Sequence, residues 1–381
     1  MGWSRPVLPG DPVIITPSQN LSATAPVTAS PRSTGTAGDL VLTKGDSSEW
    51  KSTGYDTYVT LDLSGYSDAV RRNLALGWST NSYIGDASVT DGDTYSMPGD
   101  YVVQAHAAAG GVKPADSDPG WVTIATVTGN MRRSRTHRCL FAPSSIATPY
   151  NWLRFKFTAG AAHNRADNNA CALSSVDVFG VSGQLIDDTW GFWGDSIAAE
   201  GSRVSEGLNR KLKLALQAKG FPAPLLDCIG LPGTKLVDFA TGGYGRAAWL
   251  DFLSKTAIRN LVIALGTNDA AGDVDVTACT NATNQILDDG IAVGIRMWLA
   301  DPPWSPDQAR VTRTQQLIAI FNSIRAQRNG AVGRGPDFFN GFLGHAEDFP
   351  GNDSVHPQLN WGRWSDIAAT DIAARGYPIA A

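Results

Sequence analysis

Apolar and polar positions change their pattern twice along the chain, and these changes mark an arm followed by two domains. Residues 1–38 mix short apolar pieces with proline, serine, threonine and alanine, which predicts an extended arm or linker. In residues 39–184, short runs with β-type patterning recur between Asp/Gly and Pro/Gly clusters, as is typical of an antiparallel β-sandwich. The predicted strands are 58–63, 74–78, 101–104, 121–127, 152–157 and 176–179.

The last segment, residues 185–381, alternates apolar strands with amphipathic helices. This alternation predicts a parallel sheet with helices on both faces, and functional sites in such sheets gather at the carboxyl ends of the strands. The predicted strands are 190–194, 224–229, 261–265, 297–300 and 338–342, and the predicted helices are 198–219, 247–256, 277–293, 306–328 and 361–375.

Length and charge narrow the class of protein. A chain of 381 residues is long for a single domain, and 43 % apolar residues are ample for packed cores. The net charge of −5 comes without a lysine or arginine run, so no nucleic-acid partner is expected. No apolar run approaches the roughly 20 residues of a membrane span. Met1 is not followed by a secretory signal, so we expect a trimmed mature form or a chain exported by another route.

The cysteines leave two interpretations open. Cys139 and Cys171 fall in the first half of the chain, while Cys228 and Cys279 fall in the second. This spacing permits one disulfide in each half in an oxidising compartment. Buried free thiols fit the sequence equally well.

A serine at the end of an apolar strand is the first candidate for chemistry. The strand enters the tight turn Gly194-Asp195-Ser196, and a helical pattern follows at once. Such a turn exposes the hydroxyl and sets its backbone N–H beside a helix N-terminus, where developing negative charge is favoured. The sequence therefore indicates Ser196 as a nucleophile, although Gly-Asp-Ser alone is also common in ordinary turns.

Acyl transfer through serine further needs a base, a group that orients the base, and donors for the oxyanion. Candidates for each follow later strands of the last segment or lie near its end. They are the blocks Gly230-Leu231-Pro232-Gly233-Thr234, Gly266-Thr267-Asn268-Asp269 and Asp353-Ser354-Val355-His356. No Gly-x-Ser-x-Gly, His-Glu-x-x-His or Walker motif occurs in the sequence, so neither a metal nor another cofactor is expected.

Taken in this order, the four blocks closely resemble the SGNH (GDSL-type) hydrolase family, and the resemblance covers residues 187–381. It implies a flavodoxin-like three-layer α/β/α fold and cleavage of esters, often acetyl or short acyl groups on sugars and lipids. It also implies Ser196 as nucleophile, His356 as general base and then acid, and Asp353 as the group that orients His356. The implied oxyanion hole is the N–H groups of Ser196 and Gly233 with the Asn268 amide.

Alternatives remain for several of these positions. Gly230 lies in the same loop as Gly233 and would take its role if the alignment slipped. Asn268 would instead cap a helix, and Asp353 would be a turn residue, if the blocks had no catalytic role. The other histidines match no block and are assigned to the sandwich or to loops: His106, His137, His163 and His345.

The order of features in residues 39–184 resembles the galactose-binding-like (discoidin-like) jelly-roll family. The features are Leu61-Asp62-Leu63, Gly99-Asp100-Tyr101, Gly120-Trp121-Val122, Trp152-Leu153-Arg154-Phe155 and Val176-Asp177-Val178-Phe179. Many members of that family bind sugars, while others brace a catalytic domain. Trp78 or Tyr83 is a candidate for stacking on a sugar ring, and packing in the core is the alternative for each.

Together these patterns and resemblances imply a serine esterase that removes acetyl or similar short acyl groups from acetylated sugars or polysaccharides. An extracellular or cell-surface location is expected for such an enzyme. A general short-chain esterase or lipase is the alternative among enzymes. A carbohydrate-binding or structural protein without catalytic activity is the alternative from another class.

Overall fold

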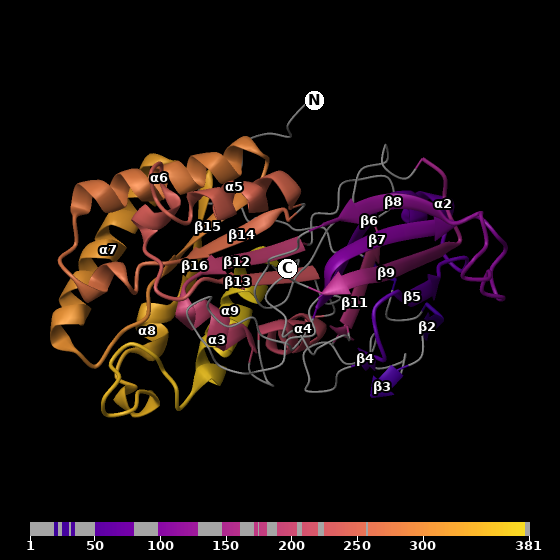
Figure 1. The fold of residues 1–381 in the computed structure, drawn as a ribbon. Coiled ribbons are helices and arrows are strands. Elements are labelled where there is room, and N and C mark those ends of the chain that lie inside the picture. The colour runs from indigo at the N-terminus through magenta and orange to yellow at the C-terminus, as the bar shows by residue number, and fades with distance from the viewer. Residues whose placement is uncertain are drawn as a thin grey trace. The chain divides into compact units, whose positions relative to one another are not determined.

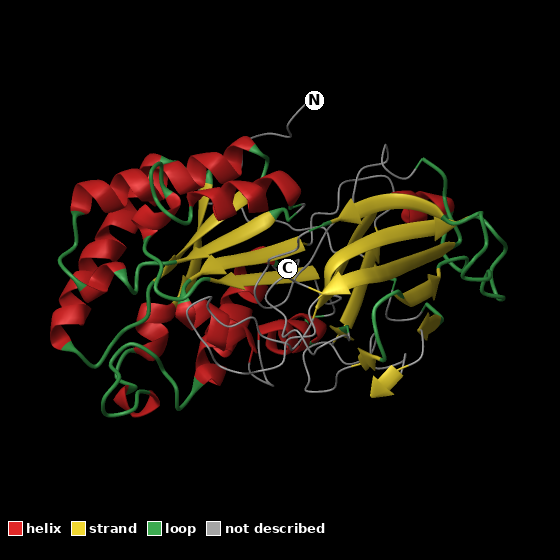
Figure 2. Cartoon of the chain, in the orientation of Figure 1, coloured by secondary structure: helices red, strands yellow, loops and turns green. Residues whose placement is uncertain are grey.

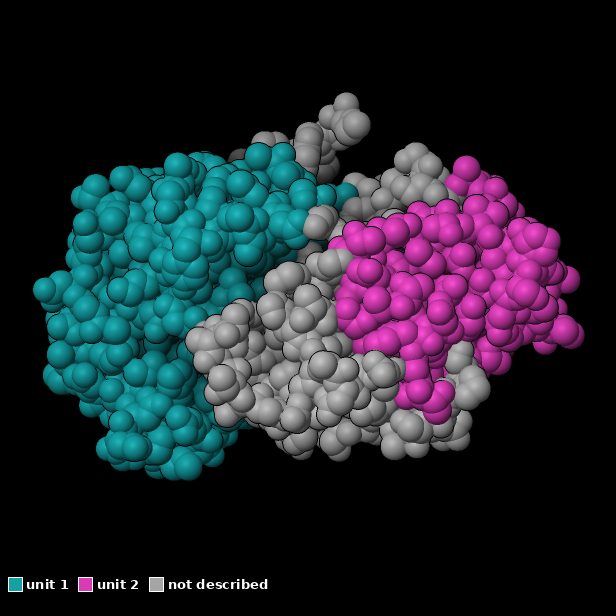
Figure 3. Space-filling model, in the orientation of Figure 1, with its two compact units in different colours: residues 1–16, 188–381 teal, residues 17–187 magenta. Residues whose placement is uncertain are grey.

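The computed structural model divides into two compact units, residues 17–187 and residues 188–381, with residues 1–16 assigned to the second (Figure 3). The domain boundary predicted between residues 184 and 185 lies outside the described residues. The structure describes residues 19–21, 25–29, 32–34, 50–79, 98–128, 147–160, 171–173, 175–180, 189–203, 208–219, 225–256 and 258–377. In these residues no helix is both long and apolar enough to cross a membrane.

The described strands of residues 17–187 pair antiparallel in every case (Figure 2). They form sheets with the strand orders β2-β5-β9-β7-β8, β1-β11-β6 and β10-β4-β3. Their bounds are β1 Gln19–Asn20, β2 Val27–Ala29, β3 Arg32–Thr34, β4 Trp50–Ser52, β5 Thr57–Asp62, β6 Leu74–Ser79, β7 Pro98–His106, β8 Val122–Val127, β9 Trp152–Gly160, β10 Ala172–Leu173 and β11 Ser175–Gly180, with the short helix α2 Asp68–Arg72. The β-sandwich and its jelly-roll topology stay predictions.

Trp78 belongs to the core of this unit. Its side chain is 0 % exposed and meets the rings of Tyr101 and Phe157 edge-on, at centroid distances of 5.7 and 6.1 Å. Aromatic pairs favour this arrangement, which also buries a large apolar area. The proposed stacking of Trp78 on a sugar is therefore wrong, and Tyr83 lies outside the described residues.

The segment predicted as an arm, residues 1–38, contributes to these sheets in its later part. Strands β1, β2 and β3 lie within it, and Leu21 is 0 % exposed. The N–H of Leu21 donates to the carbonyl of Val178 at 2.8 Å. Short apolar pieces between proline and serine are enough to add edge strands, so the prediction of an arm is corrected for the described residues 19–21, 25–29 and 32–34.

Residues 188–381 contain the predicted parallel sheet, with the strand order β13-β12-β14-β15-β16 (Figure 1). In chain order this is 2-1-3-4-5, the order of flavodoxin-like sheets. The bounds of the strands are β12 Thr189–Gly194, β13 Leu225–Gly230, β14 Asn260–Ala264, β15 Arg296–Asp301 and β16 Val332–Asp337. The carboxyl ends of β12, β13 and β14 therefore lie at one edge, side by side.

Helices cover both faces of this sheet, as side chains that alternate along each strand require. Trp190 and Phe192 of β12 pack with α3, α4, α8 and α9, whereas Trp193 packs with α5, α6 and α7 on the opposite face. The helices are α3 Ser196–Arg203, α4 Leu208–Gln217, α5 Arg246–Lys255, α6 Val276–Ala292, α7 Gln308–Gln327, α8 Phe338–Phe342 and α9 Trp361–Gly376, with the 3-10 turns η1 Leu236–Phe239, η2 Asp269–Ala271 and η3 Ala346–Asp348.

The fifth strand lies earlier in the chain than predicted. Residues 338–342 form the helix α8, whose phenylalanines are buried, and the strand is β16, Val332–Asp337. Its glycines allow close approach, because a Cβ on Gly333 would lie 2.5 Å from the Trp298 ring. The helix predicted over 198–219 is likewise observed as α3 and α4, with residues 204–207 outside the described part.

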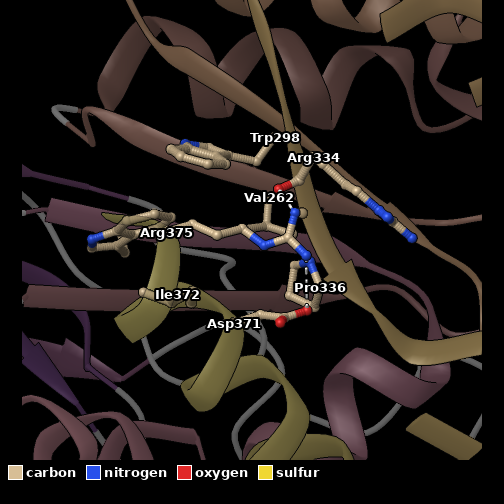
Figure 4. A pocket seen from close by; sticks show the side chains of 9 residues that line it. Val262, Trp298, Arg334, Pro336, Asp371, Ile372 and Arg375 are labelled. Atoms are coloured by element: carbon tan, nitrogen blue, oxygen red, sulfur yellow. Dashed lines mark hydrogen bonds and ion pairs between the residues drawn. The ribbon is translucent and has the colours of Figure 1, made fainter. Parts of the chain in front are cut away.

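A small cavity of about 10 Å³ lies between the sheet and α9, and Figure 4 shows its lining. Trp298 and Val262 line it from the strands, and Asp371 and Ile372 line it from the helix. The Arg375 guanidinium reaches the Asp371 carboxylate at 3.7 Å. None of the proposed site residues lines this cavity.

The described cysteines are buried free thiols: Cys171, Cys228 and Cys279. A disulfide between the cysteines of the second half is therefore absent from the structure, and the free-thiol alternative holds for Cys228 and Cys279. Cys139 lies outside the described residues.

Candidate active site

The turn that carries Ser196 is fixed by its two neighbours. A Cβ on Gly194 would lie 2.8 Å from the carbonyl oxygen of Ala264, so only glycine lets the strand turn here. Asp195 caps helix α3, because a side-chain oxygen accepts the N–H of Ile197 at 2.9 Å. Ser196 follows as the first residue of α3 and is half-buried, with its N–H at the positive end of the helix.

Ser196, His356 and Asp353 form a hydrogen-bonded chain. The Oγ of Ser196 lies 2.9 Å from Nε2 of His356, and Nδ1 of His356 lies 2.8 Å from Oδ2 of Asp353. An ionised Asp353 accepts a hydrogen bond from the Nδ1–H group, which leaves Nε2 free to accept a hydrogen bond from the serine hydroxyl. The arrangement can thus move a proton off Ser196.

Asp353 is held in place by further donors from its own loop. Its Oδ1 accepts the N–H groups of Val355 and His356 at 2.7 and 3.0 Å, and Gln358 Nε2 donates to Oδ2 at 2.9 Å. Burial opposes ionisation, but the hydrogen bonds from the His356 side chain and the two N–H groups outweigh it, so the pKa of Asp353 lies below its ordinary value. Asp353 is therefore more than a turn residue.

The loop after β13 is a type II turn at residues 231–234. Pro232 holds its second position, Gly233 has φ of +77°, and the N–H of Thr234 donates to the carbonyl of Leu231 at 3.3 Å. A positive φ of this size suits glycine. Gly230 differs, because it ends β13 and a Cβ there would lie 2.3 Å from the backbone nitrogen of Ala199. Its lack of a side chain serves the packing of α3 on the sheet.

Asn268 is tied to this turn. Its Nδ2 donates to the carbonyl of Thr234 at 3.0 Å, which uses one of its two amide hydrogens and leaves the other for a ligand. Asn268 occupies the N-cap position of η2, but its side chain makes no capping hydrogen bond. The alternative that Asn268 serves as a helix cap is therefore wrong for its side chain.

Two buried aspartates next to these residues were not singled out from the sequence. Asp195 is 1 % exposed, and burial raises its pKa to about 6, against smaller opposing effects of the Ile197 N–H and the Thr267 side chain. Asp269 is 6 % exposed and accepts the N–H of Leu236 at 3.2 Å, and burial likewise raises its pKa to about 6. The only sign of these two aspartates in the sequence was their position inside the Gly-Asp-Ser and Asn-Asp blocks.

Trp361 is another residue beside the site that the sequence did not reveal. Its ring centroid lies 6.2 Å from that of His356, with the rings tilted by 58°. The side chain is half-buried at the start of α9. The histidines assigned elsewhere have other partners: His106 faces Asp118 at 3.2 Å and His345 faces Glu347 at 2.7 Å, while His137 and His163 lie outside the described residues.

No protein-family model matches the sequence, and no curated protein matches it. Similar solved structures include a lipase/acylhydrolase from Enterococcus faecalis, 21 % identical, covering 51 % of this chain and 100 % of its own, with a TM-score of 0.38. An acetylxylan esterase from Geobacillus stearothermophilus is 18 % identical, covers 51 % of this chain and 96 % of its own, and has a TM-score of 0.38. A Bacillus subtilis protein is 11 % identical and covers 96 % of this chain and 92 % of its own, with a TM-score of 0.43.

Proposed function

We propose that this protein is a serine esterase of the SGNH (GDSL) type that hydrolyses short-chain acyl esters, with acetylated sugars or polysaccharides as its substrates. The observation that carries the proposal is the hydrogen-bonded chain of Ser196, His356 and Asp353, with distances of 2.9 and 2.8 Å. It lies at the edge of the parallel sheet where α/β enzymes place their sites.

In the first half of the reaction, Ser196 Oγ attacks the acyl carbonyl carbon while its proton passes to His356 Nε2. The carbonyl oxygen becomes an oxyanion, stabilised by the N–H groups of Ser196 and Gly233 and by the free amide hydrogen of Asn268. His356 then returns the proton to the departing alkoxide, which leaves as an alcohol. An acyl group remains on Ser196.

In the second half, a water molecule loses a proton to His356 and attacks the acyl carbon. The same donors stabilise the second oxyanion, and the proton on His356 returns to Ser196 Oγ as the carboxylic acid leaves. Asp353 stays ionised throughout, orients the imidazole and stabilises its protonated form.

Small and polar residues around the site favour a small acyl group and a polar alcohol. Asn352, Ser354 and Asn360 flank His356 along the chain. These residues supply little of the apolar area that a long chain needs, at about 0.8 kcal/mol for each buried methylene. Trp361 adds a flat apolar surface beside His356, suited to a sugar ring on the alcohol side.

The decisive test compares wild type with Ser196→Ala on acetyl and octanoyl aryl esters and on an acetylated oligosaccharide. We expect acetyl esters to be cleaved much faster than octanoyl esters, and kcat to fall by roughly 10⁶ in Ser196→Ala without a change in melting temperature. A fluorophosphonate should label Ser196, and the exposed Ser254→Ala on α5 is the matched control.

Each alternative predicts a different result. A Ser196→Ala variant with more than a few per cent of wild-type activity would point to another nucleophile. Faster cleavage of octanoyl esters, with no acetate released from the oligosaccharide, would favour the lipase alternative. Sugar binding without hydrolysis or labelling would favour the non-catalytic alternative.

A further inference from the structure

The segment between β15 and the first turn of α7 touches both loops of the candidate active site. Ser305 Oγ donates to the carbonyl of Ser354 at 2.7 Å, directly after Asp353. Arg310 Nη1 donates to the carbonyl of Thr267 at 3.2 Å, directly before Asn268. The segment is therefore bonded on one side to the acid–base loop and on the other to the loop that presents an oxyanion donor.

Arg310 differs from Ser305 because it adds a charge. It is half-buried on α7, and burial lowers its pKa, while the nearby carboxylates of Asp307 and Asp353 oppose this effect. An arginine keeps its charge at any pH at which an enzyme works. A positive charge is thus fixed close to the carboxylate that orients His356.

We propose that Arg310 is a positioning residue of the active site, which holds the loop of Asn268 in place through the carbonyl of Thr267. The inference rests on the proposed function, because it assigns Asn268 the role of oxyanion donor. A donor that is held in place before the reaction stabilises the oxyanion without having to reorganise.

Three variants test this contact. Arg310→Gln removes the charge and shortens the side chain, so it should lose the hydrogen bond to the Thr267 carbonyl, whereas Arg310→Lys keeps a long cationic donor. Arg313→Gln is the matched control, because it makes the same change three residues later, where Arg313 pairs with the exposed Asp273 at 3.6 Å. The readouts are kcat and KM on an aryl acetate, with the melting temperature as a check on folding.

For Arg310→Gln we expect kcat to fall roughly tenfold with KM within about twofold, since an oxyanion donor acts mainly in the transition state. Arg310→Lys should recover most of the lost kcat, because its ammonium group can still donate to the Thr267 carbonyl. Arg313→Gln should match wild type in both quantities.

Equal kcat values in Arg310→Gln and Arg313→Gln, or a raised KM with an intact kcat in Arg310→Gln, would overturn the inference. Both results need an active wild-type enzyme, so they are distinct from failure of the proposed function. That failure would appear as a wild-type protein that neither hydrolyses acetyl esters nor reacts with a fluorophosphonate at Ser196.

Discussion

Asp353 and Asp195 are both carboxylates of the candidate active site, and their surroundings differ. Asp353 lies on a loop, where four hydrogen bonds from Val355, His356 and Gln358 stabilise its charge and its pKa lies below the ordinary value. Asp195 is 1 % exposed at the start of α3, where burial raises its pKa to about 6. The comparison shows that hydrogen-bond donors and burial, rather than membership of a motif, give each carboxylate its role.

This difference separates a functional carboxylate from a structural one. Asp353 stays charged at any pH near neutrality and can stabilise a protonated His356. Asp195 supplies a helix cap, and its charge is a burden on the folded state. Asp269 resembles Asp195, because it is also buried and also accepts a hydrogen bond from a backbone N–H, that of Leu236.

The largest expected effects belong to the Asp353 side of the comparison. We expect His356→Ala to lower kcat by about 10⁶, and Asp353→Asn to lower it by about 10⁴, because an amide facing Nδ1 favours the wrong imidazole tautomer. Steady-state kinetics on an aryl acetate would measure both. The control is Asp366→Asn, whose exposed carboxylate pairs with Lys211 at 2.8 Å. Equal losses in the two site variants would remove the distinction between base and orienting group.

Asn268→Ala should have a smaller effect. Loss of one oxyanion donor is expected to lower kcat by roughly 10² to 10³ with little change in KM, since the donor acts mainly in the transition state. The same assay should show wild-type rates for the exposed Asn322→Ala on α7. A raised KM with an intact kcat would instead make Asn268 a residue that binds substrate.

Asp195→Asn should have the smallest of these effects, and the quantity that it changes is the stability of the fold. The folded-state pKa of about 6 exceeds the ordinary 3.8, so ionisation of Asp195 disfavours the folded state. The free energy of unfolding therefore falls progressively as the pH rises from about 4 through 6. Asparagine keeps the cap on Ile197 and has no proton to lose. We expect a gain of about 1–3 kcal/mol in unfolding free energy at pH 8 and little change at pH 4, measured by urea denaturation. A loss at pH 8 would show that the charge stabilises the fold.

The sequence predicted the elements whose structure depends on residues close together in the chain. Residues 190–194 read as a buried strand because both faces of β12 carry aromatic side chains, and Gly194 marks its end. Asp353 and His356 are three residues apart on one loop, so their contact was visible in the chain. By contrast, the sequence did not predict β16, because it contains Gly333 and Gly335, which are unusual in a strand. Their lack of side chains makes room for neighbours that only the fold brings close.

The same limit applies to the residues that support the site. The raised pKa of Asp195 depends on burial beneath other elements, and the Arg310 contact with Thr267 joins residues 43 positions apart. Neither follows from a spacing rule. Their roles emerge only when distant segments meet at the edge of the sheet.

The close contact at Gly230 has a consequence for how such an enzyme can change over time. The backbone of α3 lies directly against the end of β13, and a Cβ on Gly230 would come within 2.3 Å of Ala199. Any mutation there must displace the helix that begins with the nucleophile. Outside the turn at residues 231–234, Asn268 and residues 353–356, the loops can be lengthened or exchanged while Ser196 and its partners keep their places. Descendants of this scaffold can therefore acquire new substrates quickly at the loops, while the reaction itself is inherited almost unchanged.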